Sequence, residues 1–349
     1  MNMAKRKYSK MTKIQPAQLT MNFLTPSIDG GSSEQFYVDL SQVASLVNRR
    51  FYRQGINWAV SGMKILSQPR FEGTVIISKL PNTWVMSNAW EKSFRAWQKM
   101  NNEALAENQS VKPKFLDFKI YADSNHHQLG YGANLLPTDA SGNAATVGEW
   151  EPSTVVTPVT SGGASTPGEV AQFELIAVGA NYPGAGASGK DAVSLIEGYS
   201  NSRSLPDILD PNTPAESGDI GGFTPENWLS AMFNEGTDQD STVIDDMTTE
   251  NNIAPYPFEN GDDGAGGVYT TTMYPGGPVQ LPDLMVHDIE FISPTTVGGT
   301  TRFKGGNFPC GLIRFDVDNS SDVDQNVFIQ IDLVPGSHRG YLCEPMTEM

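Results

Sequence analysis

A glycine-rich stretch in the middle of the chain has the sharpest pattern of residues that could do chemistry. Residues 184–190 read Gly-Ala-Gly-Ala-Ser-Gly-Lys, which matches the Gly-x-x-x-x-Gly-Lys of a phosphate-binding loop. Such a loop also needs a Ser or Thr after the Lys to hold Mg²⁺. Here the next residue is Asp191, whose carboxylate would repel phosphates. We therefore interpret the stretch as a glycine-rich loop, with nucleotide binding as the weaker alternative.

Side chains that bind transition metals or act as nucleophiles are few and scattered. The chain has only four His and two Cys. His126 and His127 are adjacent, so in an extended segment they would point to opposite sides and not toward one metal. Cys310 and Cys343 are too few for a disulfide framework, and we expect them to be free thiols. No Gly-x-Ser-x-Gly elbow is present either. We therefore predict no catalytic residues, no cofactor and no enzymatic activity.

A run of acidic residues near the C-terminus is a candidate for binding a cation. It consists of Asp316, Asp318, Asp322 and Asp324. Hard cations such as Ca²⁺ prefer several carboxylates, but the run lacks the Gly and the closing Glu of an EF-hand loop. A hairpin turn with solvated acids is the favoured interpretation, and Ca²⁺ binding is the alternative.

Basic residues are concentrated at one end of an otherwise acidic chain. Residues 1–119 carry 17 Lys and Arg against 8 Asp and Glu, whereas residues 120–300 carry 2 against 25. The basic end can lie against a polyanion, while the acidic part repels it and stays solvated. The candidate nucleic-acid contacts are Lys5, Arg6, Lys7, Lys10, Lys13, Arg49, Arg50 and Arg53. The alternatives are a solvated tail or nuclear import signal for the first five, and stabilisation of a helix C-terminus for the three arginines.

The elements that would hold these residues are mostly strands. Runs of apolar and β-branched residues, several of them alternating, predict strands near residues 36, 60, 76, 117, 174, 288, 315 and 330. A period of 3.6 predicts helices over about 40–51 and 86–105, and we expect the aromatic face of the second to be buried core. Two shorter helices are predicted over 191–199 and 225–233. Because no regular βα repeat occurs, we predict an all-β fold: a single eight-stranded antiparallel jelly roll with short helices and long loop insertions.

Composition sets the remaining bounds. Hydrophobic residues make up 38% of the chain and six are Trp, which is typical of a folded protein. No run of about 18 apolar residues occurs, so no transmembrane helix is expected. The N-terminal residues lack the apolar core of a signal peptide. We expect residues 1–33 to form a flexible basic arm and residues 34–349 to form one shell domain, with surface insertions near 125–170 and 200–280.

Two C-terminal segments carry a resemblance to a known family. Residues 308–313 read Phe-Pro-Cys-Gly-Leu-Ile, and residues 331–341 read Ile-Asp-Leu-Val-Pro-Gly-Ser-His-Arg-Gly-Tyr. With the order of basic arm, strand, helix and strand, they resemble capsid proteins of small circular single-stranded DNA viruses that encode a replication-initiator protein (circovirus-like). The resemblance is strongest over residues 30–119 and 300–349. It implies a jelly roll that self-assembles into an icosahedral shell, with the basic arm facing the packaged genome.

The expected function is therefore that of a viral capsid protein with no enzymatic activity. Its partners would be further copies of itself, packaged single-stranded DNA bound without sequence preference, and a host receptor that contacts the outer loops. It would be found in the virion, with the host nucleus as a site of assembly. The alternative is a secreted or surface β-sandwich that binds Ca²⁺ or glycans through its acidic loops. The basic arm and the missing signal peptide favour the capsid.

Overall fold

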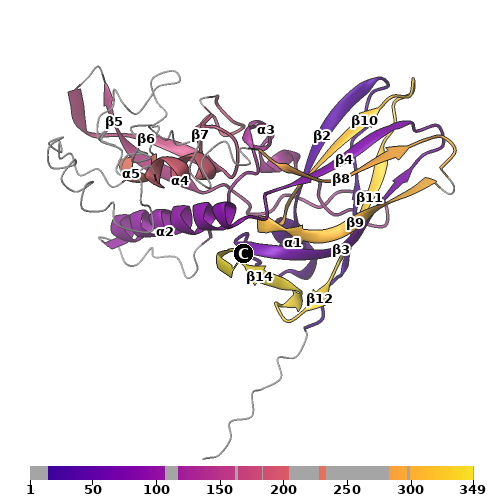
Figure 1. Ribbon diagram of the computed structural model, residues 1–349, viewed down its shortest axis with the longest axis horizontal. Coiled ribbons are helices and arrows are strands. Elements are labelled where there is room, and N and C mark those ends of the chain that lie inside the picture. Colours follow the sequence, from indigo (N-terminus) through magenta and orange to yellow (C-terminus); the bar gives the residue numbers. More distant parts are fainter. Residues whose placement is uncertain are drawn as a thin grey trace, which may run out of the picture.

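The computed structural model describes residues 15–106, 117–161, 164–182, 184–203, 228–232, 283–296 and 299–348. This part of the chain is mostly β-sheet, and two antiparallel sheets face each other as a sandwich (Figure 1). The first sheet holds β1 (Thr20–Leu24), β11 (Val327–Leu333), β3 (Ile56–Ser67) and β9 (Thr300–Phe308), with β14 (Cys343–Pro345) also on β3. The second sheet holds β2 (Ser32–Asp39), β10 (Leu312–Asn319), β4 (Gly73–Lys79) and β8 (Met285–Ile292).

The eight long strands of the sandwich pair from the two ends of the chain inward. β1 pairs with β11, β2 with β10, β3 with β9 and β4 with β8, all antiparallel. Two further pairs, β11 with β3 and β10 with β4, join these four pairs into the two sheets. The chain therefore folds as one long hairpin whose successive pairs alternate between the sheets.

The core of the sandwich follows from the alternation in the sequence. In β10, Ile313, Phe315 and Val317 are fully buried, while the residues between them are partly exposed. In β11, Ile329 and Ile331 are buried in the same way. Each such side chain contributes about 1.5–3 kcal/mol when it leaves water. The strands predicted near residues 315 and 330 are thus confirmed, together with the face that each one buries.

α1 (Leu40–Asn48) begins directly after β2 because Asp39 caps it. The Asp39 carboxylate accepts hydrogen bonds from the N–H of Ser41 at 2.8 Å and of Gln42 at 3.3 Å. The helix ends at Asn48, since Arg49 adopts a left-handed conformation with φ of 51°. The helix predicted over about 40–51 is therefore confirmed up to Asn48 and is wrong beyond it.

The segment between β4 and β8 is one large insertion beside the sandwich (Figure 1). Its helices are α2 (Trp84–Ala106), α3 (Ser124–Leu129), α4 (Leu195–Arg203) and α5 (Trp228–Ala231). Its sheet is made by the antiparallel pair β5 (Thr154–Ser161) and β6 (Ala164–Ile176), with β7 (Asp191–Ser194) parallel to β6. A second hydrophobic core fills it, in which Trp90 and Trp97 of α2 are buried. The aromatic face of this helix is therefore core at these two residues, as predicted.

The remaining elements are short. The 3₁₀ helices are η2 (Tyr131–Ala133), η5 (Pro309–Gly311) and η6 (Met346–Glu348). β12 (Pro335–Gly336) and β13 (Gly340–Tyr341) form a two-stranded hairpin after β11. β14 then returns to β3, so the C-terminal residues close the sandwich beside α1.

Three predictions within the insertion are wrong. The strand expected near residue 117 does not form over 117–120, because the backbone N–H groups there bond to side chains. The N–H of Lys119 donates to Ser153 Oγ and that of Ile120 donates to Gln54 Oε1. Residues 125–170 hold α3, β5 and part of β6 and are not one long loop. The helix predicted over 191–199 is β7 followed by the start of α4.

Two strands of the sandwich are missing from the sequence prediction. β1 lies inside the arm predicted over residues 1–33, yet its Met21 and Phe23 are fully buried against the other sheet. The flexible arm is therefore wrong from Thr20 onward, and residues 1–14 lie outside the described part. In β9 only Phe303 and Phe308 are buried, and two adjacent glycines interrupt the pattern. The strand predicted near residue 174 forms as β6, in the insertion.

Candidate nucleic-acid interface

The three predicted arginines follow α1 and are all exposed to solvent. Arg49 is the C-cap of the helix, with φ of 51° and ψ of 40°. This left-handed conformation costs a residue with a Cβ about 1–2 kcal/mol. Because Arg49 lies at the end of the helix, its charge can stabilise the helix C-terminus. Arg50 and Arg53 lie beyond the helix and are exposed to solvent.

The segment from Gln15 to Gln18 lies beside Arg50 and the end of α1. The guanidinium of Arg50 donates hydrogen bonds to Gln15 Oε1 and to the carbonyl oxygen of Pro16, both at 3.3 Å. Gln18 anchors the same segment, since its N–H donates to Asn48 Oδ1 at 3.1 Å. The predicted contacts Lys5, Arg6, Lys7, Lys10 and Lys13 lie outside the described residues. In the sequence these five residues come directly before Gln15 and Pro16, which bond to Arg50.

The structure adds Arg339 and His338 to this surface. Arg339 lies between β12 and β13 with φ of 52°, and its guanidinium donates a hydrogen bond to the carbonyl oxygen of Phe51. Its own carbonyl oxygen accepts a hydrogen bond from Tyr52 Oη at 3.0 Å. The ring of His338 lies 6.4 Å from that of Tyr52. Both residues belong to the Ser-His-Arg-Gly part of the segment that carries the family resemblance, which is the sequence signal that could have identified them.

The positive charge of this surface comes from arginine. Burial lowers the pKa of His338, and the neighbouring charge of Arg339 lowers it further, so this imidazole is neutral at pH 7. Burial raises the pKa of Tyr52, while the charges of Arg50 and Arg339 both lower it. Arg339 bonds to Phe51, which follows Arg50 in the chain, and it lines one pocket together with Arg53, so these arginines form one positive patch. Because arginine stays protonated, the charge of this patch does not change across physiological pH.

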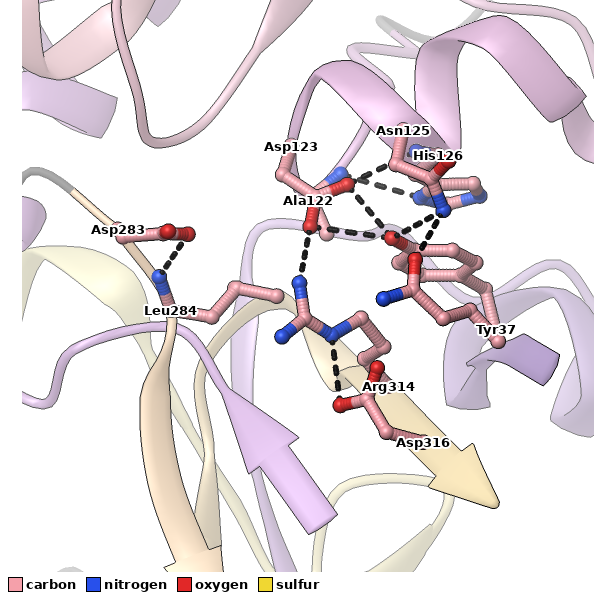
Figure 2. A network of polar contacts seen from close by, with 10 residues as sticks. Tyr37, Ala122, Asp123, Asn125, His126, Asp283, Leu284, Arg314 and Asp316 are labelled. Carbon is pink, nitrogen blue, oxygen red and sulfur yellow. Dashed lines mark hydrogen bonds and ion pairs between the residues drawn. The ribbon is translucent and has the colours of Figure 1, made fainter. Parts of the chain in front are cut away.

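A separate cluster of charged residues joins the insertion to the sandwich (Figure 2). Arg314 of β10 donates to Asp123 at 2.9 Å and to Asp316 at 3.0 Å. Tyr37 of β2 donates its Oη–H to Asp123 at 2.8 Å, and burial raises its pKa so that the phenol keeps its proton. Asp123 also caps α3 by accepting the N–H of His126. These bonds stay within the protein, so we assign the cluster to holding α3 against β2 and β10.

The stretch that matches a phosphate loop does not have the geometry of one. Residues 184–190 connect β6 to β7, and α4 begins only after β7. The N–H of Gly186 donates to Lys190 O and that of Gly189 donates to Gly186 O, both at 2.9 Å. A phosphate loop instead leads directly into a helix and turns such N–H groups toward the ligand. The interpretation as a glycine-rich loop fits these bonds.

The acidic run near the C-terminus is not gathered into a cation site. Asp318 accepts hydrogen bonds from the hydroxyls of Ser33 and Ser320, and Asp324 accepts the N–H of Gly30. Asp316 is paired with Arg314, and Asp322 is exposed in the turn before β11. Within the part of the chain that the structure describes, no three His, Cys, Asp or Glu side chains could hold a metal ion together.

The adjacent histidines lie in a helix and not in an extended segment, and their rings have different neighbours. His126 Nε2 lies 2.9 Å from Asn134 Oδ1, whereas His127 Nε2 lies 3.1 Å from Glu174 Oε2. Both are buried in α3, where we had expected a loop. Cys310 and Cys343 are free thiols, as expected.

Comparison of the chain with protein-family models, with curated proteins and with solved structures finds no match. Among the described residues, none of the helices is both long and apolar enough to cross a membrane. The function must therefore be inferred from the fold and from the basic patch formed by Arg49, Arg50, Arg53 and Arg339.

Proposed function

We propose that this chain is the shell subunit of a small virus, a jelly roll that assembles into a closed icosahedral particle and packages single-stranded DNA. The observation that carries the proposal is the pairing of β1 with β11, β2 with β10, β3 with β9 and β4 with β8. Folding one long hairpin into two four-stranded sheets in this way produces the interlocked Greek keys of a jelly roll. That architecture is used by viral capsids, lectins and cupins.

Charge distribution favours the capsid among these classes. The basic patch lies where the N-terminal segment meets α1, through the bonds from Arg50 to Gln15 and Pro16. Residues 120–300, which include most of the insertion, carry 2 basic residues against 25 acidic ones. A shell subunit needs this separation, because one surface must lie against nucleic acid while the other repels it. Contacts from arginine to phosphate do not read the sequence, so the packaged strand is bound without sequence preference.

Exposed apolar side chains on β8 support self-association. β8 is one of the two edge strands of the second sheet, and Val286, Ile289 and Phe291 are 53%, 53% and 60% exposed. A monomer would leave this apolar group in water, which soluble proteins tend to avoid. A neighbouring copy of the chain that packs against β8 would bury it. The particle would be the virion, with the acidic insertion on its outside available to a host receptor and with the host nucleus as a site of assembly.

Electron microscopy of the purified protein tests the proposal. Negative-stain images and the 260/280 nm absorbance ratio are recorded for the full chain and for a variant that lacks residues 1–14. This deletion stops before β1, so Met21 and Phe23 remain in the core. We expect uniform closed particles from both proteins, with clearly less nucleic acid in the truncated one. A monomer at every salt concentration tried would contradict the proposal.

A further inference from the structure

We propose that a pocket beside the basic patch binds one nucleotide of the packaged strand, with its base against aromatic rings and its phosphate on Arg53 and Arg339. The inference rests on the proposed function and adds to it a defined contact for a base. The pocket has a volume of about 520 Å³. This lies within the range of pockets that hold small ligands.

Distant parts of the chain build the pocket. Its walls include residues from the loop after α1, from α2 and from the turn between β12 and β13, among them Phe51, Arg53, Gly55, Trp90, Phe94 and Arg339. The first group includes Arg53 and begins directly after Arg49 and Arg50 in sequence. The pocket therefore adjoins the basic patch, and single-stranded DNA bound to the patch would lie next to the opening of the pocket.

α2 provides aromatic side chains to one wall of the pocket. The rings of Trp90 and Phe94 are stacked, with centroids 5.0 Å apart and planes inclined by 16°. Trp90 is buried, whereas Phe94 is only half-buried and lines the pocket. A Cβ on Gly55 would lie 2.2 Å from Trp90 Cζ2, so a glycine is needed for the loop to approach this ring so closely. Stacking of bases on such rings tolerates any sequence, as the packaging of a whole genome requires.

Charge in the pocket suits a phosphate. Among the described residues that line it, Arg53 and Arg339 are basic and none is acidic. Arg339 is held in a left-handed conformation that is unfavourable for a residue with a Cβ, and strain of this kind is concentrated at ligand sites. A guanidinium carries five N–H donors, so the bond to Phe51 that fixes Arg339 is compatible with a further bond to a phosphate.

A nucleobase adds a contact that a phosphate alone cannot make. Phe94 is half-buried and lines the pocket, and bases stack on aromatic rings of this kind. A free phosphate or a simple polyanion would account for the arginines alone.

The test separates base binding from phosphate binding. Fluorescence anisotropy measures the affinity of the full chain for a labelled oligothymidylate and for an abasic strand with the same number of phosphates, at about 0.1 M salt. Phe94→Leu removes the ring and keeps an apolar side chain. We expect it to weaken oligothymidylate binding by about tenfold and to leave the abasic strand unaffected. Arg53→Gln should weaken both. Arg95→Gln is the control, since Arg95 lies on the same helix and its side chain is 76% exposed.

Two results would contradict the proposal that the pocket binds a base. One is wild-type affinity of Phe94→Leu for oligothymidylate, and the other is an equal loss for both strands, which would mean that the ring acts only through the fold. Failure of the wild-type chain to bind either strand would overturn the proposed function and this inference with it. Photo-crosslinking of the wild-type chain to an iodouridine-substituted strand needs no variant. We expect crosslinks in peptides that contain Phe51, Trp90 or Phe94, and crosslinks confined to other regions would contradict the proposal.

Discussion

Replacing Arg49, Arg50 and Arg53 together by Gln should change how the binding of single-stranded DNA depends on salt. The three side chains are exposed, so each substitution should alter the free energy of unfolding by less than about 0.5 kcal/mol. The variant should therefore keep its fold; it loses three positive charges and the bonds from Arg50 to Gln15 and Pro16. Each contact between a basic side chain and a phosphate releases counterions from the strand, which makes affinity fall as salt rises.

The expected magnitude follows from the three charges. On single strands each phosphate contact contributes about 0.7 to the slope of log affinity against log salt concentration. Three contacts therefore contribute a slope of about 2. A fourfold increase in salt should weaken the wild-type chain about 20-fold more than the triple variant.

The measurement is anisotropy of a labelled oligonucleotide over a series of salt concentrations. The matched control replaces Arg70, Arg95 and Arg302 by Gln, which are also exposed and remove the same net charge. We expect the control to keep the wild-type slope, because none of these side chains follows α1 or lines the pocket. An unchanged slope in the first variant, or an equal reduction in the control, would refute the role assigned to the patch.

Three further predictions concern stability. Burial raises the pKa of Asp39 to about 6 from the ordinary 3.8, so the folded state binds this proton more tightly than the unfolded chain does. The free energy of unfolding should therefore fall by about 3 kcal/mol as pH rises from about 4 to about 6, and Asp39→Asn should remove this contribution in urea titrations. Gly73→Ala should cost about 3 kcal/mol, since a Cβ would lie 1.8 Å from the carbonyl oxygen of Asp318. Gly132→Ala meets no atom within 4 Å and should change the free energy of unfolding by less than about 0.5 kcal/mol, so equal melting temperatures for the two variants would contradict this packing. Phe315→Ala should cost about 3–5 kcal/mol in calorimetry because its ring is fully buried between the sheets, and a loss below about 1 kcal/mol would contradict that placement.

Where a segment carries its own pattern, the sequence predicts the structure well. The alternation of Ile313, Phe315 and Val317 identifies β10 and the face that it buries. Asp39 before a run of apolar residues at helical spacing identifies the start of α1. These signals are local, because each depends only on residues within one strand or one helical turn.

The wrong predictions arise where distant residues decide the local structure. Extended backbone at Lys119 and Ile120 bonds to the side chains of Ser153 and Gln54, which no alternation in the sequence reveals. β1 has only two fully buried side chains, Met21 and Phe23, so five residues in a basic, proline-containing region gave too weak a pattern. Its stability comes from pairing with β11, more than 300 residues away in the chain.

The candidate site was predicted only in part for the same reason. Arg49, Arg50 and Arg53 are close in sequence and could be recognised as a basic cluster. Arg339 reaches Phe51 only after β12 and β13 fold back toward α1, and their sequence separation of 288 hides the contact. The aromatic face of α2 was expected to be core, which holds for Trp90, but half-buried Phe94 also lines the pocket. The exposure of Phe94 depends on the position of the loop after α1, whose residues line the same pocket.

The most direct test of the shell proposal is a cryo-electron microscopy reconstruction of particles assembled from the full chain. We predict a closed shell in which β8 of each subunit is covered by a neighbouring copy, and in which Arg53 and Arg339 face the interior against density for nucleic acid. A reconstruction in which these arginines face the outside, or a protein that forms no closed particle in the presence of single-stranded DNA, would contradict it.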